Sequence, residues 1–201
     1  MTTPLGPGAG GAASQEREFD MPAPAPRIET ERLVLRGWRL DDFDRYAEMF
    51  AAPETHHIGG PLTRGDAWRR FLQMPGAWAL QGFAMFAVEE RASGRFMGQA
   101  GPWQPDGWPG TEVGYAFHPE AWGRGYATEA CAAAMDWAFD TLGWSEVIHS
   151  ISPANTASQA VAHRLGARNR GPGRFPPPLD ALGIEVWSQS REHWRARRAT
   201  A

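Results

Sequence analysis

The 201-residue sequence contains one cysteine, Cys131, and no long hydrophobic run. A lone cysteine forms no intrachain disulfide, which excludes the small secreted folds that disulfides hold together. A helix that spans a bilayer needs about 20 apolar residues, and no segment reaches that length. We therefore expect a cytoplasmic protein without a membrane partner, in which Cys131 is a small buried side chain.

The chain also lacks a strong charge of either sign, since its formal net charge is −3 and its pI is about 6.1. Proteins that bind nucleic acid usually carry a basic face, so we expect no nucleic-acid partner. The basic stretch 191–198 is interpreted as a solvated helix rather than a phosphate site. We expect no bound metal, because no cysteine or carboxylate cluster accompanies His56 and His57, which are interpreted as exposed loop residues.

Hydrophobic residues make up 42% of the chain, enough for one core and one domain. Residues 1–26 are rich in Gly, Ala and Pro, contain no apolar run suited to a signal peptide, and are expected to be a disordered tail. The domain is expected at 27–195, followed by a short tail at 196–201.

Apolar periodicity and turn residues predict alternating strands and helices. Strands are expected at 27–38, 83–89, 95–103, 111–118, 144–151 and 183–190. Helices are expected from Asp41 or Asp42 to about 51, and at 63–80, 123–142 and 155–165. Pro75 and Gly76 should kink or divide the second helix, and a Pro-rich loop at 171–180 should precede the last strand. This order favours a mixed α+β sheet over a doubly wound parallel one.

The stretch 112–130 is the most informative, because a strand passes through a glycine-rich turn directly into a long helix. Gly123 and Gly125 permit close backbone approach, so the amides of residues 123–128 can converge on a phosphate. The helix N-terminus favours the same anion, and Arg124 adds a charged side chain. The alternative is an ordinary strand-to-helix turn. A nucleotide-binding protein is disfavoured, because neither Gly-x-Gly-x-x-Gly nor a phosphate loop closed by Lys-Ser or Lys-Thr is present.

Two segments carry a family resemblance. Trp122-Gly-Arg-Gly-Tyr-Ala127 resembles the pyrophosphate-binding motif of the GNAT N-acetyltransferases, Gln/Arg-x-x-Gly-x-Gly/Ala, with Trp122 at its first position, as is common in the branch of ribosomal-protein N-terminal acetyltransferases. Residues 155–167 resemble the family's Asn-x-x-Ser-x-x-Val/Ala-x-x-x-Leu-Gly-Phe segment, with Ala167 in place of the aromatic residue. The opening residues 29–36 and the closing residues 188–194 also resemble that branch, so the likeness spans about 28–195.

The resemblance implies a GNAT-like α+β fold, with a mixed, mostly antiparallel sheet flanked by helices on both faces. It implies acetyl-CoA as acyl donor and no metal, with the pyrophosphate on the 123–128 turn and the pantetheine paired to the backbone of the preceding strand. A backbone N–H near Phe117 is expected to stabilise the oxyanion. The residues implied to bind acetyl-CoA are Tyr115, Ala116, Phe117, Trp122, Gly123, Arg124, Gly125, Tyr126, Ala127, Thr128, Asn155 and Ser158.

Acetyl transfer requires a neutral amine and a proton for the leaving thiolate. Glu112 is the candidate general base, acting through a water chain, and Glu185 is a second candidate. The alternative for Glu112 is a solvated carboxylate at a strand end. Many GNAT enzymes use a tyrosine as general acid, but helix 155–165 contains none, and the resemblance to the ribosomal-protein branch implies Ser158 in that role. The alternative is an ordinary first-turn helix serine. Asn155 is expected to bind pantetheine, to cap the helix, or both.

The acceptor is left open between a protein N-terminus and a small amine such as an amino acid, polyamine or aminoglycoside, because variable loops decide acceptor choice. Trp103 and Trp108 are candidates to line its pocket. The main alternative function is an acyl-CoA-binding regulator or sensor with little catalysis. The tryptophan-rich composition is also compatible with a homodimer.

Overall fold

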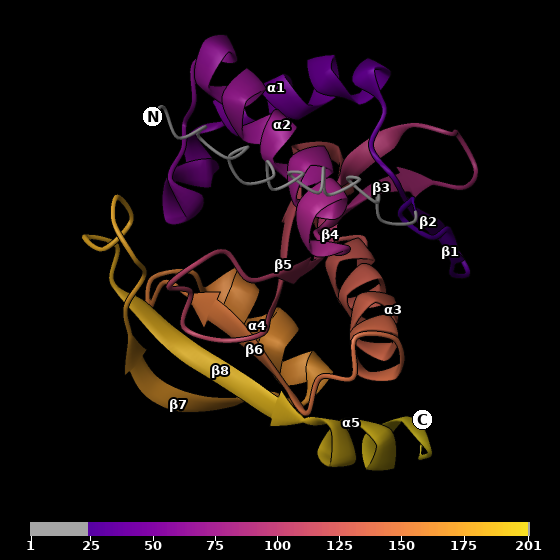
Figure 1. The fold of residues 1–201 in the computed structure, drawn as a ribbon, viewed down its shortest axis with the longest axis vertical. Coiled ribbons are helices and arrows are strands. Elements are labelled where there is room, and N and C mark those ends of the chain that lie inside the picture. The colour runs from indigo at the N-terminus through magenta and orange to yellow at the C-terminus, as the bar shows by residue number, and fades with distance from the viewer. Residues whose placement is uncertain (1–23, 201) are drawn as a thin grey trace, which may run out of the picture.

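The computed structural model describes residues 24–200, in which one mixed sheet carries all the strands (Figure 1). The strands are β1 (Ile28–Glu29), β2 (Leu33–Arg36), β3 (Phe86–Glu90), β4 (Phe96–Trp103), β5 (Glu112–Phe117), β6 (Glu146–Ile151), β7 (Arg168–Gly173) and β8 (Ile184–Ser190). The α-helices are α1 (Phe43–Ala51), α2 (Arg64–Gln81), α3 (Tyr126–Asp140), α4 (Thr156–Leu165) and α5 (Arg191–Arg198). Short 3-10 helices cover Leu40–Asp42, Pro53–Ile58 and Pro119–Ala121.

The strands follow the spatial order β1-β2-β3-β4-β5-β6-β8-β7. Every neighbouring pair is antiparallel except β5 and β6, which are parallel. The sequence-based expectation of a mixed, mostly antiparallel α+β sheet is therefore confirmed. The single parallel pair lies at the centre of the sheet, next to the glycine-rich turn.

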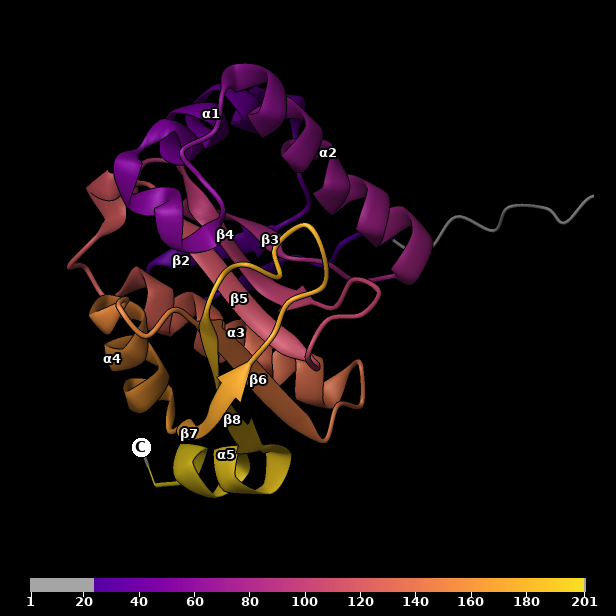
Figure 2. The ribbon, with the colours of Figure 1, turned by 90° about the vertical axis from the view of Figure 1, so that its left-hand side faces the viewer.

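Helices cover both faces of the sheet, as alternate residues of β3 show. Phe86 and Val88 belong to the hydrophobic cluster that contains the buried side chains of α3. Ala87, between them, belongs to a second cluster with the buried side chains of α1 and with Ala67 and Phe71 of α2. Successive strand residues point to opposite faces, so α1 and the first half of α2 cover one face and α3 the other, whereas Met74 and Trp78 in the second half of α2 belong to the cluster that contains α3. Figure 2 shows α1 and α2 at the top and α4 lower down, while the rings of Trp78 in α2 and Trp137 in α3 lie 5.7 Å apart.

Two expectations about single elements are wrong. The strand expected at 27–38 is two strands, because the chain turns back where the amide of Thr30 donates to the carbonyl oxygen of Leu33 at 2.9 Å. The second helix is not divided, because α2 runs through Pro75. Buried Met74 and Trp78 pack into the core on either side of the proline, and this tertiary packing keeps the helix continuous.

Other boundaries also differ from those expected. The loop expected at 171–180 begins later, because residues up to Gly173 belong to β7, and α3 begins at Tyr126 rather than at Gly123. The helix α5 runs to Arg198, past the expected domain boundary at 195. The tail expected at 1–26 lies almost wholly outside the described residues.

Cys131 is fully buried in α3, which confirms its expected role as a small core side chain. Burial raises the pKa of its thiol well above the ordinary value. None of the helices within residues 24–200 combines the length and apolar character that crossing a bilayer requires.

Candidate active site

The parallel strands β5 and β6 begin side by side and then separate. Their pairing joins only Glu112 with Ile148, beside a backbone hydrogen bond of 2.9 Å from the Ile148 amide to the Thr111 carbonyl oxygen. One residue further on, the His149 side chain bridges the gap, and its Nδ1 lies 2.7 Å from the Val113 carbonyl oxygen. Beyond Val113, β5 has no strand partner on this side among the described residues. Its edge there can pair with an extended ligand.

The bridge made by His149 is fixed in one tautomer. A carbonyl oxygen only accepts, so Nδ1 carries the proton and donates to Val113. Burial lowers the pKa of His149 to about 4, so the ring is neutral at pH 7. Nε2 then accepts, and Nε2 of Gln189 lies 3.2 Å from it. The neutral ring holds the two strands at a fixed separation just where they part.

Glu112 lies at the point of separation and is buried, with 7% of its surface exposed. Its Oε2 accepts hydrogen bonds from Nε1 of Trp108 at 2.5 Å and from Oγ of Ser150 at 2.8 Å. Burial raises the pKa of the Glu112 carboxyl to about 7, although these hydrogen bonds act in the opposite direction. The interpretation of Glu112 as a solvated carboxylate is therefore wrong. A carboxyl group that titrates near neutrality is suited to proton transfer.

The Glu112 side chain points to the α1–α2 side of the sheet. It shares this face with Ala116, which packs against α1 and α2, because alternate strand residues point the same way. In the antiparallel pairing with β4, Trp103 lies opposite Glu112 and Gln99 lies opposite Ala116, so both share that face. Between them, Gly114 leaves room for the Met85 side chain, since a Cβ there would lie 2.6 Å from Cε of Met85 and 3.4 Å from Oε1 of Glu112.

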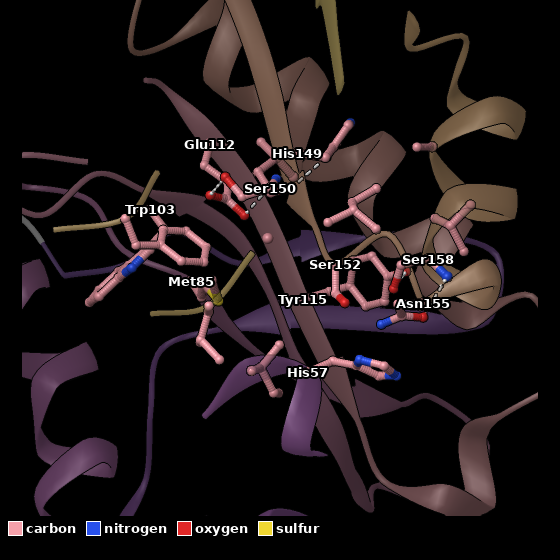
Figure 3. Close-up of a pocket in the computed structure, with 18 of the residues that line it drawn as sticks. His57, Met85, Trp103, Glu112, Tyr115, His149, Ser150, Ser152, Asn155 and Ser158 are labelled. Atoms are coloured by element: carbon pink, nitrogen blue, oxygen red, sulfur yellow. Dashed lines mark hydrogen bonds between the residues drawn. The ribbon is translucent and has the colours of Figure 1, made fainter. Parts of the chain in front are cut away.

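Glu112, Trp103 and Gln99 line one pocket, the central pocket, whose wall also includes part of α4 (Figure 3). Figure 3 shows Glu112 and Trp103 toward one end, and Tyr115, Ser158 and Asn155 toward the other. Both tryptophans proposed to line a pocket, Trp103 and Trp108, are among its walls. The central pocket therefore joins the carboxyl of Glu112 to the first turn of α4.

Ser158 and Asn155 meet β5 at the far end of the central pocket. The Tyr115 hydroxyl donates to Oγ of Ser158 at 2.9 Å. Asn155 is the N-cap of α4, and its Oδ1 accepts from the Ser158 amide at 3.0 Å. The capping role predicted for Asn155 is thus confirmed. The Tyr115 contact was not visible in the sequence, because the two residues lie on different elements.

The glycine turn lies directly beyond β5. Gly123 and Gly125 have φ values of 71° and 79°, in the left-handed region that favours glycine. Nε1 of Trp122 donates to the Phe117 carbonyl oxygen at 2.9 Å, which ties the turn to the end of β5. A Cβ added at Gly123 would have no other atom within 4 Å, so the backbone there is accessible. The backbone around α3's N-terminus, including Ala127 and Thr128, therefore fits the expected pyrophosphate site.

Arg124 does not reach freely into that site. Its Nη2 lies 2.6 Å from Oε1 of Glu90, and its guanidinium lies over the Tyr126 ring at 4.5 Å. The Tyr126 hydroxyl donates to the same Glu90 oxygen at 2.5 Å. Oγ of Ser93 also donates to Oε2 of Glu90, at 2.6 Å. This hydrogen bond contributes most to lowering the pKa of Glu90 to about 2, and those from Tyr126 and Arg124 add to it. The charge of Arg124 is thus largely matched within the protein, and Tyr126 has only its backbone available to an anion.

Two other candidates occupy different places. Glu185 on β8 accepts from Nδ2 of Asn169 at 2.7 Å and is not among the walls of the central pocket. His57 does line the pocket and is only half-buried, with its ring 3.8 Å from that of His56. No cluster of three or more His, Cys, Asp or Glu side chains suited to a metal occurs in residues 24–200.

Several pocket residues carry no sequence motif and were not predicted. Ser150 and His149 follow from the separation of β6, which only the fold reveals. Gln99 is 2% exposed, and its Oε1 has no hydrogen-bond partner among the described residues. Arg70 on α2 and Phe175 after β7 also line the central pocket. Only the apolar neighbours of Gln99 gave any hint that its amide would be buried.

The sequence is similar to known proteins over most of its length. The family model described as "Acetyltransferase (GNAT) domain" matches residues 32–168. The uncharacterized N-acetyltransferase p20 of Bacillus licheniformis is 30% identical over 148 residues, covering 72% of this chain and 83% of that protein. The uncharacterized protein YkkB of Bacillus subtilis is 36% identical over 87 residues, covering 42% of this chain. The match spans only about half, 51%, of YkkB.

A solved structure gives the same result over a longer span. The crystal structure of an acetyltransferase from Agrobacterium tumefaciens superposes with a TM-score of 0.75 and 30% sequence identity. The superposition covers 87% of this chain and 99% of that one. The similarity therefore extends over most of the chain.

Proposed function

The chain belongs to the GNAT acetyltransferase family, and from this we propose that it is a cytoplasmic, acetyl-CoA-dependent N-acetyltransferase that acetylates a primary amine by direct attack in a ternary complex. The donor site would consist of the glycine turn and the unpaired edge of β5. In this arrangement the backbone amides near Gly123 and Gly125 bind pyrophosphate, and the β5 edge beyond Val113 pairs with the pantetheine amides. A β5 amide near Phe117 would stabilise the tetrahedral oxyanion.

Glu112 is proposed as the general base. An ammonium group must lose a proton before its nitrogen can attack the thioester carbon. At pH 7 this costs about 1 kcal/mol for an α-amine with a pKa of 7.8, and about 4.6 kcal/mol for a lysine with a pKa of 10.4. A carboxylate with a pKa of about 7 accepts that proton at neutral pH, directly or through water.

Ser158 is proposed as the general acid. As the tetrahedral intermediate collapses, the carbon–sulfur bond breaks and the thiolate takes a proton. Oγ of Ser158 already accepts a hydrogen bond from Tyr115, so its own hydrogen is free to be donated. Tyr115 then acts as a positioning residue that can return a proton to Ser158.

One observation carries this proposal, namely the placement of the two groups around β5. Glu112 faces the α1–α2 side of the sheet, whereas Tyr115 is an odd number of residues away and points to the α4 side. The amine can therefore be deprotonated on one side of β5 while the thiolate is protonated on the other. A protein that only binds acyl-CoA has no need of a buried carboxyl group that titrates near pH 7.

The test is amine-dependent release of the CoA thiol, measured with acetyl-CoA and a broad panel of amines. The sequence contains no lysine, so transfer to lysine side chains of the protein itself cannot contribute to the signal. We expect turnover with at least one class of amine, and a kcat reduced by roughly 100-fold or more in Glu112→Gln. Glu185→Gln is the matched control and should retain activity. Binding of acetyl-CoA without turnover on any amine would instead support a sensor.

A further inference from the structure

Arg70 is a cation in the wall of the central pocket that the proposed mechanism does not use. It lies on α2 and is half-buried. Its Nη1 donates to the Ile58 carbonyl oxygen at 2.7 Å, and its guanidinium lies over the Phe50 ring at 4.6 Å. These two contacts hold the guanidinium in place without neutralising its charge.

The guanidinium of Arg70 has no carboxylate partner within 4.0 Å among residues 24–200. Its neighbour Arg69, by contrast, is exposed and pairs with Asp66 at 2.6 Å. Burial lowers the pKa of Arg70, since its charge is poorly solvated there. The remaining N–H donors of Arg70 are not among the buried side-chain atoms without a partner, so they are accessible to an anion that enters the pocket.

Among residues 24–200, Arg70 and Glu112 are the only Arg, Lys, Asp or Glu side chains in the wall of the central pocket. Both lie on the α1–α2 side of the sheet, since α2 packs on the face to which Glu112 points. Gln99, with its unsatisfied Oε1, shares that face. One compartment thus presents a carboxyl group, an amide oxygen and a guanidinium.

The segment after β7 connects the positions of these two charges. Phe175 packs on the Trp108 ring at 4.4 Å, and Trp108 donates to Glu112. Further along, Leu179 approaches Arg70, because a Cβ at Gly59 would lie 3.5 Å from Leu179 and 3.8 Å from Nη1 of Arg70. This segment therefore contributes apolar side chains, Phe175 and Leu179, to the pocket wall near both charges.

We propose that Arg70 binds a carboxylate carried by the acetyl acceptor, and that the acceptor is a small amine with a carboxylate, such as a free amino acid. The inference rests on the proposed acetyltransferase function and names its substrate class. The amine end lies toward Glu112 and Gln99, whose oxygens accept N–H groups, and the carboxylate lies at Arg70. A protein N-terminus fits this compartment poorly, because its α-carboxyl group is already an amide.

The experiment compares kcat/KM for the proteinogenic L-amino acids with kcat/KM for their carboxamides, in the wild type, Arg70→Met and Arg69→Met. The α-amine of a carboxamide has the lower pKa, so amine chemistry alone favours the carboxamide. We expect the wild type to prefer at least one free amino acid by roughly 10-fold to 100-fold, the contribution of a charge-assisted hydrogen bond. Arg70→Met should remove this preference by raising KM for the amino acid, whereas Arg69→Met should keep it.

A wild type that prefers the carboxamides, or a preference that survives in Arg70→Met, would overturn the inference. The comparison of amino acids with carboxamides in the wild type tests the inference even if Arg70→Met fails to fold. Calorimetric titration of the same amino acids into CoA-saturated protein separates the two proposals. Amino-acid binding that Arg70→Met abolishes supports the role of Arg70 even if no acetyl transfer occurs, in which case only the proposed function fails. Acetylation confined to carboxamides or amidated peptides would preserve the function and reject Arg70.

Discussion

Nε1 of Trp108 donates a 2.5 Å hydrogen bond to Oε2 of the buried Glu112 carboxyl group. Phe175 packs on the Trp108 ring at 4.4 Å and holds the indole against that oxygen. Burial favours the neutral carboxyl group, whereas the indole N–H favours the carboxylate. The pKa of about 7 is the balance between these effects, so it depends on a residue from the loop before β5.

The first prediction concerns the pH dependence of catalysis. A base with a pKa of about 7 is protonated and inactive in acid, so kcat should rise with pH and level off above about pH 8. This rising part of the profile is its acid limb, and the residual rate of Glu112→Gln should lack it. Measuring kcat from pH 5.5 to 9 in both proteins tests the assignment, and an unchanged limb in the variant would reject Glu112 as the base.

The second prediction concerns Trp108→Phe, which keeps the ring packing and removes the N–H donor. The carboxylate of Glu112 loses a hydrogen bond, so its pKa should rise further. The acid limb of the kcat profile should therefore move to higher pH. Trp68→Phe, at a partly exposed position on α2, is the control and should leave the limb in place. A limb that moves to lower pH in Trp108→Phe would contradict the account.

The third prediction concerns stability. The folded state raises the Glu112 pKa from 4.5 to about 7, so folding retains a proton that the unfolded chain loses. This contribution to stability is present at low pH and is lost as the pH rises toward 7. Glu112→Gln lacks the effect, so its stability relative to wild type should increase by roughly 2 to 3 kcal/mol between pH 5 and pH 8. Urea unfolding at both pH values measures it, and a constant difference would contradict the burial argument.

The fourth prediction concerns the hydroxyl pair on the α4 side. Ser158→Ala should lower kcat by roughly 10-fold to 100-fold, because water substitutes only partly for a positioned acid. Tyr115→Phe keeps the ring and should have a smaller effect, since Tyr115 only positions Ser158. Thr156→Ala, an exposed hydroxyl in the same helical turn, is the control. Equal activity of Ser158→Ala and wild type would remove Ser158 from the mechanism.

Sequence patterns predicted most of the elements, because strand alternation, caps and glycine stops are local signals. Edge strand β7 was missed, since Arg168 to Gly173 contains two glycines and a proline and looks like a loop. It pairs only with β8, and at a sheet edge a proline's missing N–H can be tolerated. The undivided helix α2 also shows that local signals alone do not decide an element, because tertiary packing outweighs the local signal of Pro75.

The residues of the candidate site likewise fall into those that a local sequence motif predicts and those that only the fold brings together. Asn155, Ser158 and the glycine turn were predictable because each belongs to a contiguous motif next to a helix N-terminus. Glu112 was named from its place at a strand end, but its burial depends on Trp108 and Ser150, which only the separation of β5 and β6 brings together. Arg70 and Gln99 sit within a helix and a strand without any motif. Their role depends on which face of the sheet they share.

The most direct test of the account is thermal stabilisation by acetyl-CoA, compared among wild type, Gly125→Glu and Gly143→Glu. Both glycines have positive φ, so both variants carry similar backbone strain, but only Gly125 belongs to the proposed pyrophosphate turn. At 100 times the dissociation constant, ligand should stabilise the folded state by about 2.7 kcal/mol. The account predicts a shift in wild type and Gly143→Glu that Gly125→Glu loses. No shift in wild type would contradict the acetyl-CoA site and the acetyltransferase function built on it.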